Sequence, residues 1–173
     1  MGFIKEEDDR SAWERFLIPK FDLAFWLRLL ILSVGTILFV RYVATPAFTA
    51  GASMIPTYAE REFVVIWHPV YWFRDPQVGD VVAVRYIGEK VMFFKRVVAT
   101  EGQVVEFRHG RLFVDGKESP YDWNRLTPCN WRLPPRKVPK GEVYLVGDNR
   151  SMPAEEHVFG HVSIRRIVGM PMW

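Results

Sequence analysis

The hydrophobic and polar positions of this chain fall into two patterns. Residues 23 to 40 read LAFWLRLLILSVGTILFV, in which fourteen of the eighteen residues are apolar. With Tyr42, Val43 and Ala44, this run reaches the ~20 residues that a helix needs to cross a bilayer. The pattern predicts one membrane-spanning helix over residues 23–44.

Arg28 is the main objection to a membrane span, since a charged side chain at the bilayer centre is costly. It lies one and a half turns from the start of the run, where its long side chain reaches the headgroups. Two other interpretations stay open: a buried helix of a soluble protein, and a signal peptide cleaved near the small residues of AFTAGAS. We favour a retained anchor, because the acidic EEDD at 6–9 is unlike a signal-peptide n-region.

Basic residues predict the orientation of this helix. Four of them precede it: Lys5, Arg10, Arg15 and Lys20. Arg41 is the only one in the fifteen or so residues after the run. Because cytoplasmic flanks carry an excess of Lys and Arg, we expect residues 1–22 in the cytoplasm and residues 45–173 across the membrane.

From residue 60 onward the pattern changes to short apolar runs rich in Val, Ile, Phe and Tyr, separated by Gly, Asp and Pro. Such runs predict strands. They are FVVIW, DVVAVRY, VMFFKRVVA, QVVEF, RLFVDG, EVYLVGD and VSIRRIVG. Turns are expected at His109 and Gly110, and at Asp115 and Gly116. We therefore expect a mainly β domain whose strands fold into a barrel or sandwich.

Residues 118–139 interrupt the series of strands. They contain five prolines: Pro120, Pro128, Pro134, Pro135 and Pro139. Proline donates no backbone hydrogen bond and marks turns and loops. We expect an irregular, proline-rich insert here rather than a strand pair.

Charge and composition exclude several classes of protein. The formal net charge is +3, with acids interspersed among the basic residues. The basic stripe of a nucleic-acid-binding protein is missing, so we expect no nucleic-acid partner. The four histidines show no metal-ligand spacing with Cys or carboxylates, and we expect neither a metal nor another cofactor. The single cysteine, Cys129, has no partner for an internal disulfide.

Lys95 is the first candidate for chemistry. If residues 91–99 form a strand, its side chain lies on one face with apolar neighbours. These neighbours are Val91, Phe93, Val97 and Ala99. Burial disfavours the charged ammonium and lowers a lysine pKa from ~10.4. A lysine that is neutral near neutral pH is a general base.

Ser53 is the second candidate, in the stretch GASMIPTY that follows the hydrophobic run. A serine hydroxyl is a weak nucleophile until a base takes its proton, and a desolvated lysine can act as that base. Gly51 and Ala52 allow a tight turn and the approach of a substrate backbone, and Pro56 stiffens the exit. The ordinary alternatives stay open: a serine that caps a turn, and a lysine that snorkels from an edge strand.

Four motifs occur in a recognisable order: SMIPT at 53–57, VGDVVAV at 78–84, FKRVVATEG at 94–102 and LVGDNRS at 145–151. In order and spacing they resemble the motifs of type I signal peptidases. Members of this family are membrane-anchored Ser/Lys proteases that remove signal peptides from exported proteins. The resemblance covers about residues 22–169.

The resemblance implies a role for each matching residue. Ser53 is the expected nucleophile, and Lys95 is the expected general base that later protonates the leaving amine. The backbone amide of the nucleophile is expected to bind the oxyanion, helped in some members by a hydroxyl two residues earlier, where this chain has Gly51. The other expected supporting residues are Ala52, Met54, Arg96, Asp148 and Asn149.

Arg96 and Asp148 match an ion pair that holds the lysine strand against the GDNR turn in the family. A surface pair of no consequence is the alternative. The VGDVVAV strand and the segment before Lys95 match the walls of a cleft in which an extended peptide pairs as an added strand. Its pockets are expected to accept small residues at the first and third positions before the cut, as in Ala-x-Ala.

The resemblance also implies a location and partners. We expect a single-pass protein of the inner (plasma) membrane with its catalytic domain on the extracytoplasmic side. Its expected partners are preprotein signal peptides, the lipid bilayer and the secretion translocon.

The last motif departs from the family pattern. Where members usually have a serine, an acidic residue and an arginine, this chain has Pro153, Glu155 and His157. The serine whose hydroxyl helps to orient the lysine is therefore absent. Three alternatives stay open: Ser151 or a water replaces this hydroxyl, packing alone orients Lys95, or the activity is reduced. Glu155 and His157 are positioned in the sequence to restore an ion pair when His157 is protonated.

Three other functions compete with this one. One is a specialised relative that processes a dedicated substrate, of the conjugative-pilus or mitochondrial inner-membrane type. Another is a non-catalytic relative that binds peptides, although retention of both Ser53 and Lys95 argues against it. A self-cleaving Ser/Lys repressor is excluded by the hydrophobic helix, which stands where such a protein has a DNA-binding segment.

Overall fold

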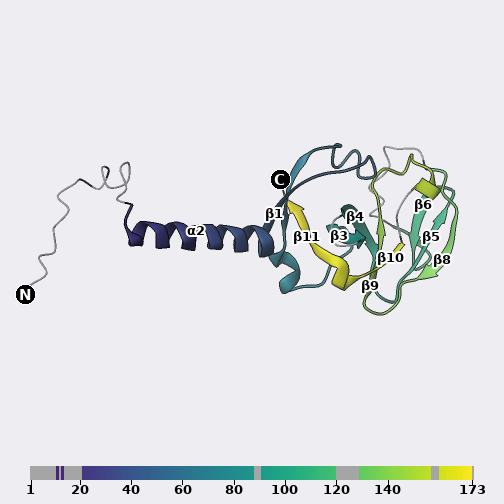
Figure 1. The fold of residues 1–173 in the computed structure, drawn as a ribbon. Coiled ribbons are helices and arrows are strands. Elements are labelled where there is room, and N and C mark those ends of the chain that lie inside the picture. The colour runs from purple at the N-terminus through teal and green to yellow at the C-terminus, as the bar shows by residue number, and fades with distance from the viewer. Residues whose placement is uncertain are drawn as a thin grey trace, which may run out of the picture. The chain divides into compact units, whose positions relative to one another are not determined.

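The computed structural model describes residues 11, 13, 21–87, 91–119, 129–156 and 160–172. The chain divides into two units, Met1–Val40 and Arg41–Trp173. The first contains most of a single long helix, and the second contains all the strands (Figure 1). The prediction of a mainly β protein with one N-terminal apolar helix is confirmed.

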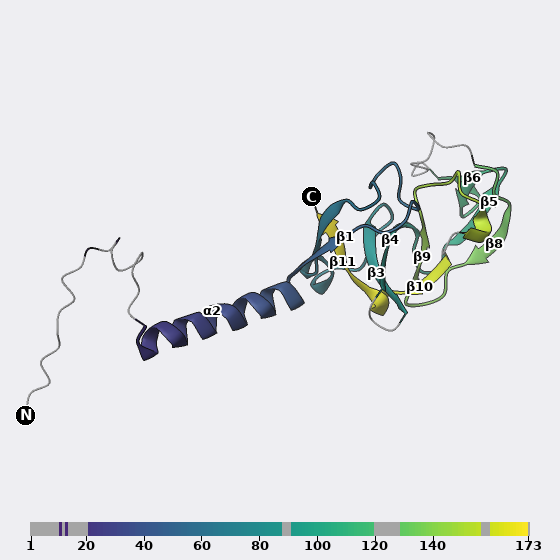
Figure 2. The same cartoon turned by 45° about the horizontal axis from the view of Figure 1, so that its top comes forward.

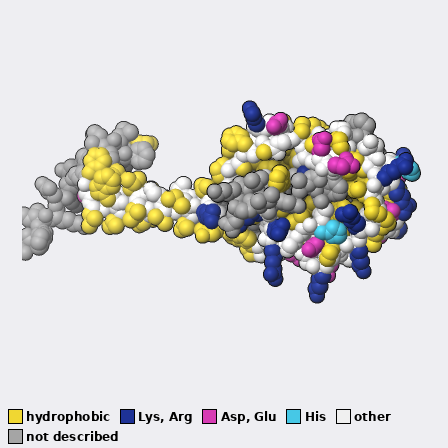
Figure 3. Space-filling view, turned by 45° about the vertical axis from the view of Figure 1, so that its right-hand side comes forward, with side chains coloured by type: hydrophobic (Ala, Val, Ile, Leu, Met, Phe, Trp, Pro, Cys, Tyr) yellow, Lys and Arg dark blue, Asp and Glu magenta, His cyan; other side chains and the backbone are white. Residues whose placement is uncertain are grey.

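Helix α2 spans Leu23–Tyr42 and begins with a side-chain cap, in which the carboxylate of Asp22 accepts a hydrogen bond from the Phe25 N–H at 2.8 Å. None of its residues is buried, and hydrophobic side chains follow it along its length (Figure 3). Among the described residues it is the one helix long and apolar enough to cross a membrane. The helix ends at Tyr42, because Ala44 already begins a strand.

The second unit contains two antiparallel sheets (Figures 1 and 2). The large sheet has the order β1 (Ala44–Phe48), β2 (Phe63–Trp67), β11 (Ile167–Met172), β3 (Val81–Ile87), β4 (Val91–Ala99), β9 (Glu142–Val146), β10 (Gly160–Ser163). The small sheet has the order β7 (Lys117–Glu118), β6 (Arg111–Val114), β5 (Val104–Arg108), β8 (Leu133–Lys137). Three short 3-10 helices connect these strands: η1 (Pro69–Trp72), η2 (Ala154–Glu156) and η3 (Ile164–Arg166).

Both predicted turns of the small sheet are confirmed. His109 and Asp115 have positive φ angles of 48° and 53°, and the glycine after each is also left-handed. Gly110 is required for a second reason, since a Cβ there would lie 1.9 Å from the carbonyl oxygen of Cys129. These turns join β5 to β6 and β6 to β7 in antiparallel register.

Two strand predictions were wrong. The run VSIRRIVG is divided by η3, so that β10 pairs with β9 and β11 pairs with β2 and β3. In the proline-rich insert, residues 133–137 form β8 and pair with β5, although no strand pair was expected there. Strand β8 lies at the edge of the small sheet, where proline is tolerated because one side of the strand needs no ladder hydrogen bonds.

Strand β4 lies between β3 and β9, and its apolar side chains enter three separate hydrophobic clusters. Phe94 packs with Met54 in one cluster, Val97 belongs to a second and Val98 to a third. Ala99 joins the cluster of Val98 rather than that of Val97, because the register of β4 with β9 shifts between residues 97 and 99. The predicted common face of Lys95 and Ala99 is therefore interrupted by this irregularity.

Candidate active site

Lys95 lies in the middle of β4, opposite Val82 of β3, and is 5% exposed. Burial lowers the pKa of its ammonium from 10.5 to about 8, while the negative charge of Asp148 acts in the opposite direction. Among the described residues, no carboxylate lies within ion-pair distance of Lys95. The burial of this side chain and its lowered pKa agree with the prediction from the sequence pattern.

The next residue of β4, Arg96, forms a buried two-point ion pair with Asp148. Nε donates to Oδ1 at 2.8 Å and Nη2 donates to Oδ2 at 2.6 Å. Asp148 is 3% exposed and Arg96 is 8% exposed. The third side of the guanidinium donates to the carbonyl oxygen of Gly79 at 2.8 Å. The pair is thus no surface contact, and it fixes the turn after β9 beside the lysine strand.

Ser53 lies in the turn between β1 and β2. Gly51 begins this turn with a φ of 79°, a left-handed conformation that favours glycine. Met54 and Tyr58 are buried in the same cluster as Phe94, so the residue after Ser53 packs with the residue before Lys95. Ser53 itself is partly buried.

The turn after β9 holds the serine turn by three hydrogen bonds. The Asn149 backbone N–H donates to the carbonyl oxygen of Ser53 at 2.9 Å, and its side-chain amide donates to that of Ala52 at 2.9 Å. The hydroxyl of Thr57 donates to Oδ2 of Asp148 at 2.5 Å. Because Asp148 also binds Arg96, the structure brings the serine turn, the GDNR turn and the lysine strand together.

The sequence prediction missed Thr57, although it belongs to the SMIPT motif. Ser151 had been expected as one substitute for the missing serine. Its hydroxyl instead donates to Oδ1 of Asn149 at 2.6 Å and so orients the amide that binds Ala52. Pro153 immediately precedes η2, which contains Glu155. The expected pair of Glu155 with His157 lies outside the described residues.

We expect Thr57→Val to lower the free energy of unfolding by about 1.5–3 kcal/mol, because it removes a hydrogen bond to a buried carboxylate. Urea denaturation measures this loss. Thr100→Val is the matched control: that hydroxyl donates to the neutral amide oxygen of Gln103 at 3.2 Å, so the expected loss is about 0.5–1.5 kcal/mol. Equal losses in the two variants would contradict a charge-assisted contact at Thr57.

Chemically, the arrangement supplies an amine with a lowered pKa and a hydroxyl in a firmly held turn. The described ranges contain no group of three His, Cys, Asp or Glu residues that could hold a metal ion.

Comparison with known proteins shows which family the chain resembles. Residues 23–173 match the family model described as "Signal peptidase, peptidase S26". The chain is 33% identical to "Probable signal peptidase I-1" of Synechocystis sp. over 136 residues, which cover 74% of this chain and 69% of the relative. It is 36% identical to "Thylakoidal processing peptidase 1, chloroplastic" of Arabidopsis thaliana over 146 residues, which are 78% of this chain and 42% of that longer protein.

A crystal structure of a signal peptidase I from Enterococcus faecalis V583 also aligns with the chain. The aligned part is 23% identical, covers 56% of this chain and 97% of the other, and gives a TM-score of 0.45.

Proposed function

Because this chain belongs to the S26 family of signal peptidases, we propose that it is a membrane-bound serine endopeptidase that removes N-terminal signal peptides from exported preproteins. Ser53 is the nucleophile and Lys95 the general base of this proposal. The observation that carries it is the burial of Lys95, with a pKa lowered to about 8, on the strand joined through Arg96 and Asp148 to the serine turn.

In the proposed reaction, the neutral amine of Lys95 takes the proton of the Ser53 hydroxyl as Oγ attacks the scissile carbonyl carbon. The backbone N–H of Ser53 donates to the oxyanion, and Gly51 adds no hydroxyl to it. The ammonium of Lys95 then protonates the leaving amine, which departs as the new N-terminus of the mature protein. Water, deprotonated by Lys95, hydrolyses the acyl-enzyme and releases the signal peptide.

The proposed substrate binds as an extended strand between the serine turn and the β3–β4 region, with small residues at the first and third positions before the cut. Helix α2, residues 23–42, anchors the chain in the inner (plasma) membrane, residues 1–22 lie in the cytoplasm and residues 44–173 form the extracytoplasmic catalytic domain. Lipids surround α2, whose exposed apolar side chains support this assignment. The translocon delivers the substrate.

The pH dependence of cleavage tests the role of Lys95. A protonated amine accepts no proton, so kcat/KM is expected to fall about tenfold per pH unit below the pKa of the base. The half-maximal value is expected at about pH 8. The measurement uses the detergent-solubilised full chain and a preprotein with an Ala-x-Ala site. An acidic limb near pH ~10.4, the value for an exposed lysine, would contradict a desolvated base.

A further inference from the structure

Asp80, in the VGDVVAV motif, is the centre of a polar cluster before β3. Its Oδ2 accepts hydrogen bonds from the Tyr71 hydroxyl at 3.1 Å, from Nη1 of Arg74 at 2.6 Å and from the Gln77 backbone N–H at 3.0 Å. Its Oδ1 accepts a second bond from Arg74 at 3.2 Å. This Asp80 cluster fixes the conformation of residues 77–80.

The same short loop holds the strand that carries Lys95. The Gly79 N–H donates to the carbonyl oxygen of Val97 at 2.9 Å, and the Val97 N–H donates to the carbonyl oxygen of Asp80 at 2.9 Å. The Gly79 carbonyl oxygen accepts the bond from Arg96. The two residues that follow Lys95 are therefore both bound to the loop that Asp80 organises.

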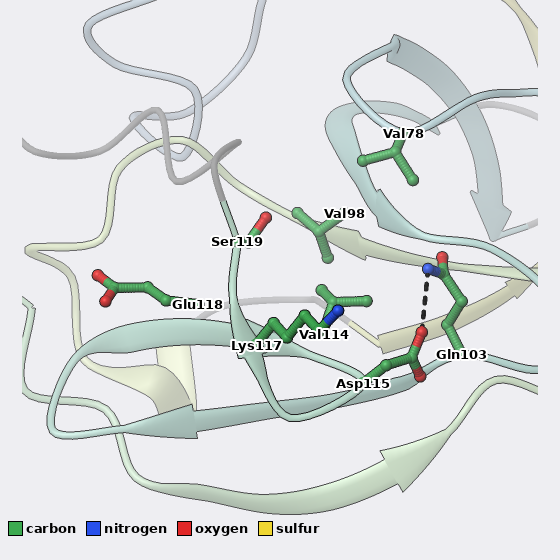
Figure 4. Close-up of a pocket in the computed structure, with 8 residues that line it drawn as sticks. All are labelled: Val78, Val98, Gln103, Val114, Asp115, Lys117, Glu118 and Ser119. Carbon is green, nitrogen blue, oxygen red and sulfur yellow. Dashed lines mark hydrogen bonds between the residues drawn. The ribbon is translucent and has the colours of Figure 1, made fainter.

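Packing contributes little to the loop on one side. Val78 lines an open cavity of about 340 Å³, whose other walls include Gln103, Asp115 and Lys117. Figure 4 shows Val78 across this space from Lys117 and Asp115. A side chain that faces a cavity gives up the dispersion contacts that would otherwise hold its backbone. The position of the loop therefore depends more strongly on its hydrogen bonds, which include those of the Asp80 cluster.

We propose that Asp80 is a positioning residue for the Ser53/Lys95 site, acting through the loop 77–80 on Arg96 and the lysine strand. The proposal rests on the proposed function. Asp80 touches neither the nucleophile nor the base. It acts by keeping the Gly79 carbonyl where it binds one side of the Arg96 guanidinium, so that the other two sides stay aligned with Asp148.

Loss of this alignment has an electrostatic consequence at Lys95. Asp148 is the charged group that raises the pKa of Lys95, and Arg96 neutralises Asp148. Tyr58 interacts with both Arg96 and Asp148, and burial raises the pKa of its hydroxyl, so that it stays neutral at pH 8. If Arg96 moves away, Asp148 holds the proton on Lys95 more strongly. A larger fraction of the base is then protonated at a given pH.

The test measures kcat, KM and the pH profile of kcat/KM for Asp80→Asn and Tyr71→Phe in the solubilised full chain. Asp80→Asn is expected to lower kcat about tenfold, because a misplacement of about 1 Å can cost up to about 100-fold. KM is expected to stay within about twofold, and the acidic limb is expected to move to higher pH. Tyr71→Phe removes one of the hydrogen bonds to Asp80. It is expected to lower kcat and to move the acidic limb to higher pH, each by less than Asp80→Asn does.

Asp115→Asn is the matched control. Asp115 also accepts a backbone N–H, from Val104 at 2.8 Å, and an amide N–H, from Gln103 at 3.3 Å, but it holds a turn of the small sheet. Its variant is expected to lose stability without a shift in the pH profile.

Superposition of the acidic limbs of wild type, Asp80→Asn and Tyr71→Phe would overturn the inference. Tyr71→Phe decides alone if Asp80→Asn does not fold. Failure of the wild type itself to cleave would overturn the proposed function instead.

Discussion

Replacing Lys95 with methionine is expected to lower kcat for preprotein cleavage by about 10⁴- to 10⁶-fold. Methionine keeps an apolar stem of similar length in the buried position but removes the amine that takes the serine proton. Ser53→Ala is expected to cause a loss of the same order, because the two groups act as one unit. Cleavage of an Ala-x-Ala preprotein by the solubilised chain measures both.

Lys95→Arg separates the role of a base from that of a buried cation. A guanidinium stays protonated at any pH at which the protein is folded, so this variant is expected to be as inactive as Lys95→Met. Activity in either variant would contradict the assignment of Lys95. If the wild type binds a signal peptide but does not cleave it, the dedicated-substrate or non-catalytic alternative would be favoured. Pro153→Ser, which restores the serine of the family pattern, would then be the first substitution to test.

Asp148→Ala is expected to cause the largest loss of stability, about 3–5 kcal/mol in the free energy of unfolding. The variant leaves the guanidinium of Arg96 buried without its carboxylate and removes the acceptor of the Thr57 hydroxyl. Cleavage is expected to fall as well, since the serine turn loses a contact with the lysine strand. Urea unfolding of the full chain in detergent, monitored by tryptophan fluorescence, measures the loss in the free energy of unfolding.

Glu118→Ala is the control for this prediction. Glu118 pairs with Arg111 at 3.3 Å, but the two side chains are 49% and 68% exposed. An exposed pair contributes about 0.2–1 kcal/mol, so a loss as large as that of Asp148→Ala would contradict the argument from burial. The double variant Arg96→Met with Asp148→Leu is expected to recover stability but not cleavage, because an apolar pair fills the space without binding Thr57.

Strands in which apolar and polar residues alternate, or in which apolar residues are continuous, were predictable from the sequence. The burial of Lys95 within VMFFKRVVA was predictable too. Two of the four strands at sheet edges were not, since β1 contains Pro46 and β8 contains Pro134 and Pro135. Proline is a strong signal against a strand except at an edge, and sequence alone does not show which strands are edges.

The supporting contacts of the site were less predictable than its central residues. Thr57 and Asp148 are 91 residues apart, and their contact depends on the pairing of β4 with β9. The roles of Tyr71 and Arg74 depend on the folding of a loop with no periodic pattern. A spacing rule identifies residues on one strand or turn, whereas contacts of this kind follow from the tertiary arrangement.

The position of β11 in the large sheet has a consequence for biogenesis. This strand, formed by residues 167–172, lies between β2 and β3. The hairpin that carries Ser53 and the hairpin that carries Lys95 are therefore joined within the sheet only after this late segment has been synthesised. Pairing between distant segments forms slowly, so we expect a nascent chain to have no peptidase activity until β11 has been synthesised and has paired with β2 and β3.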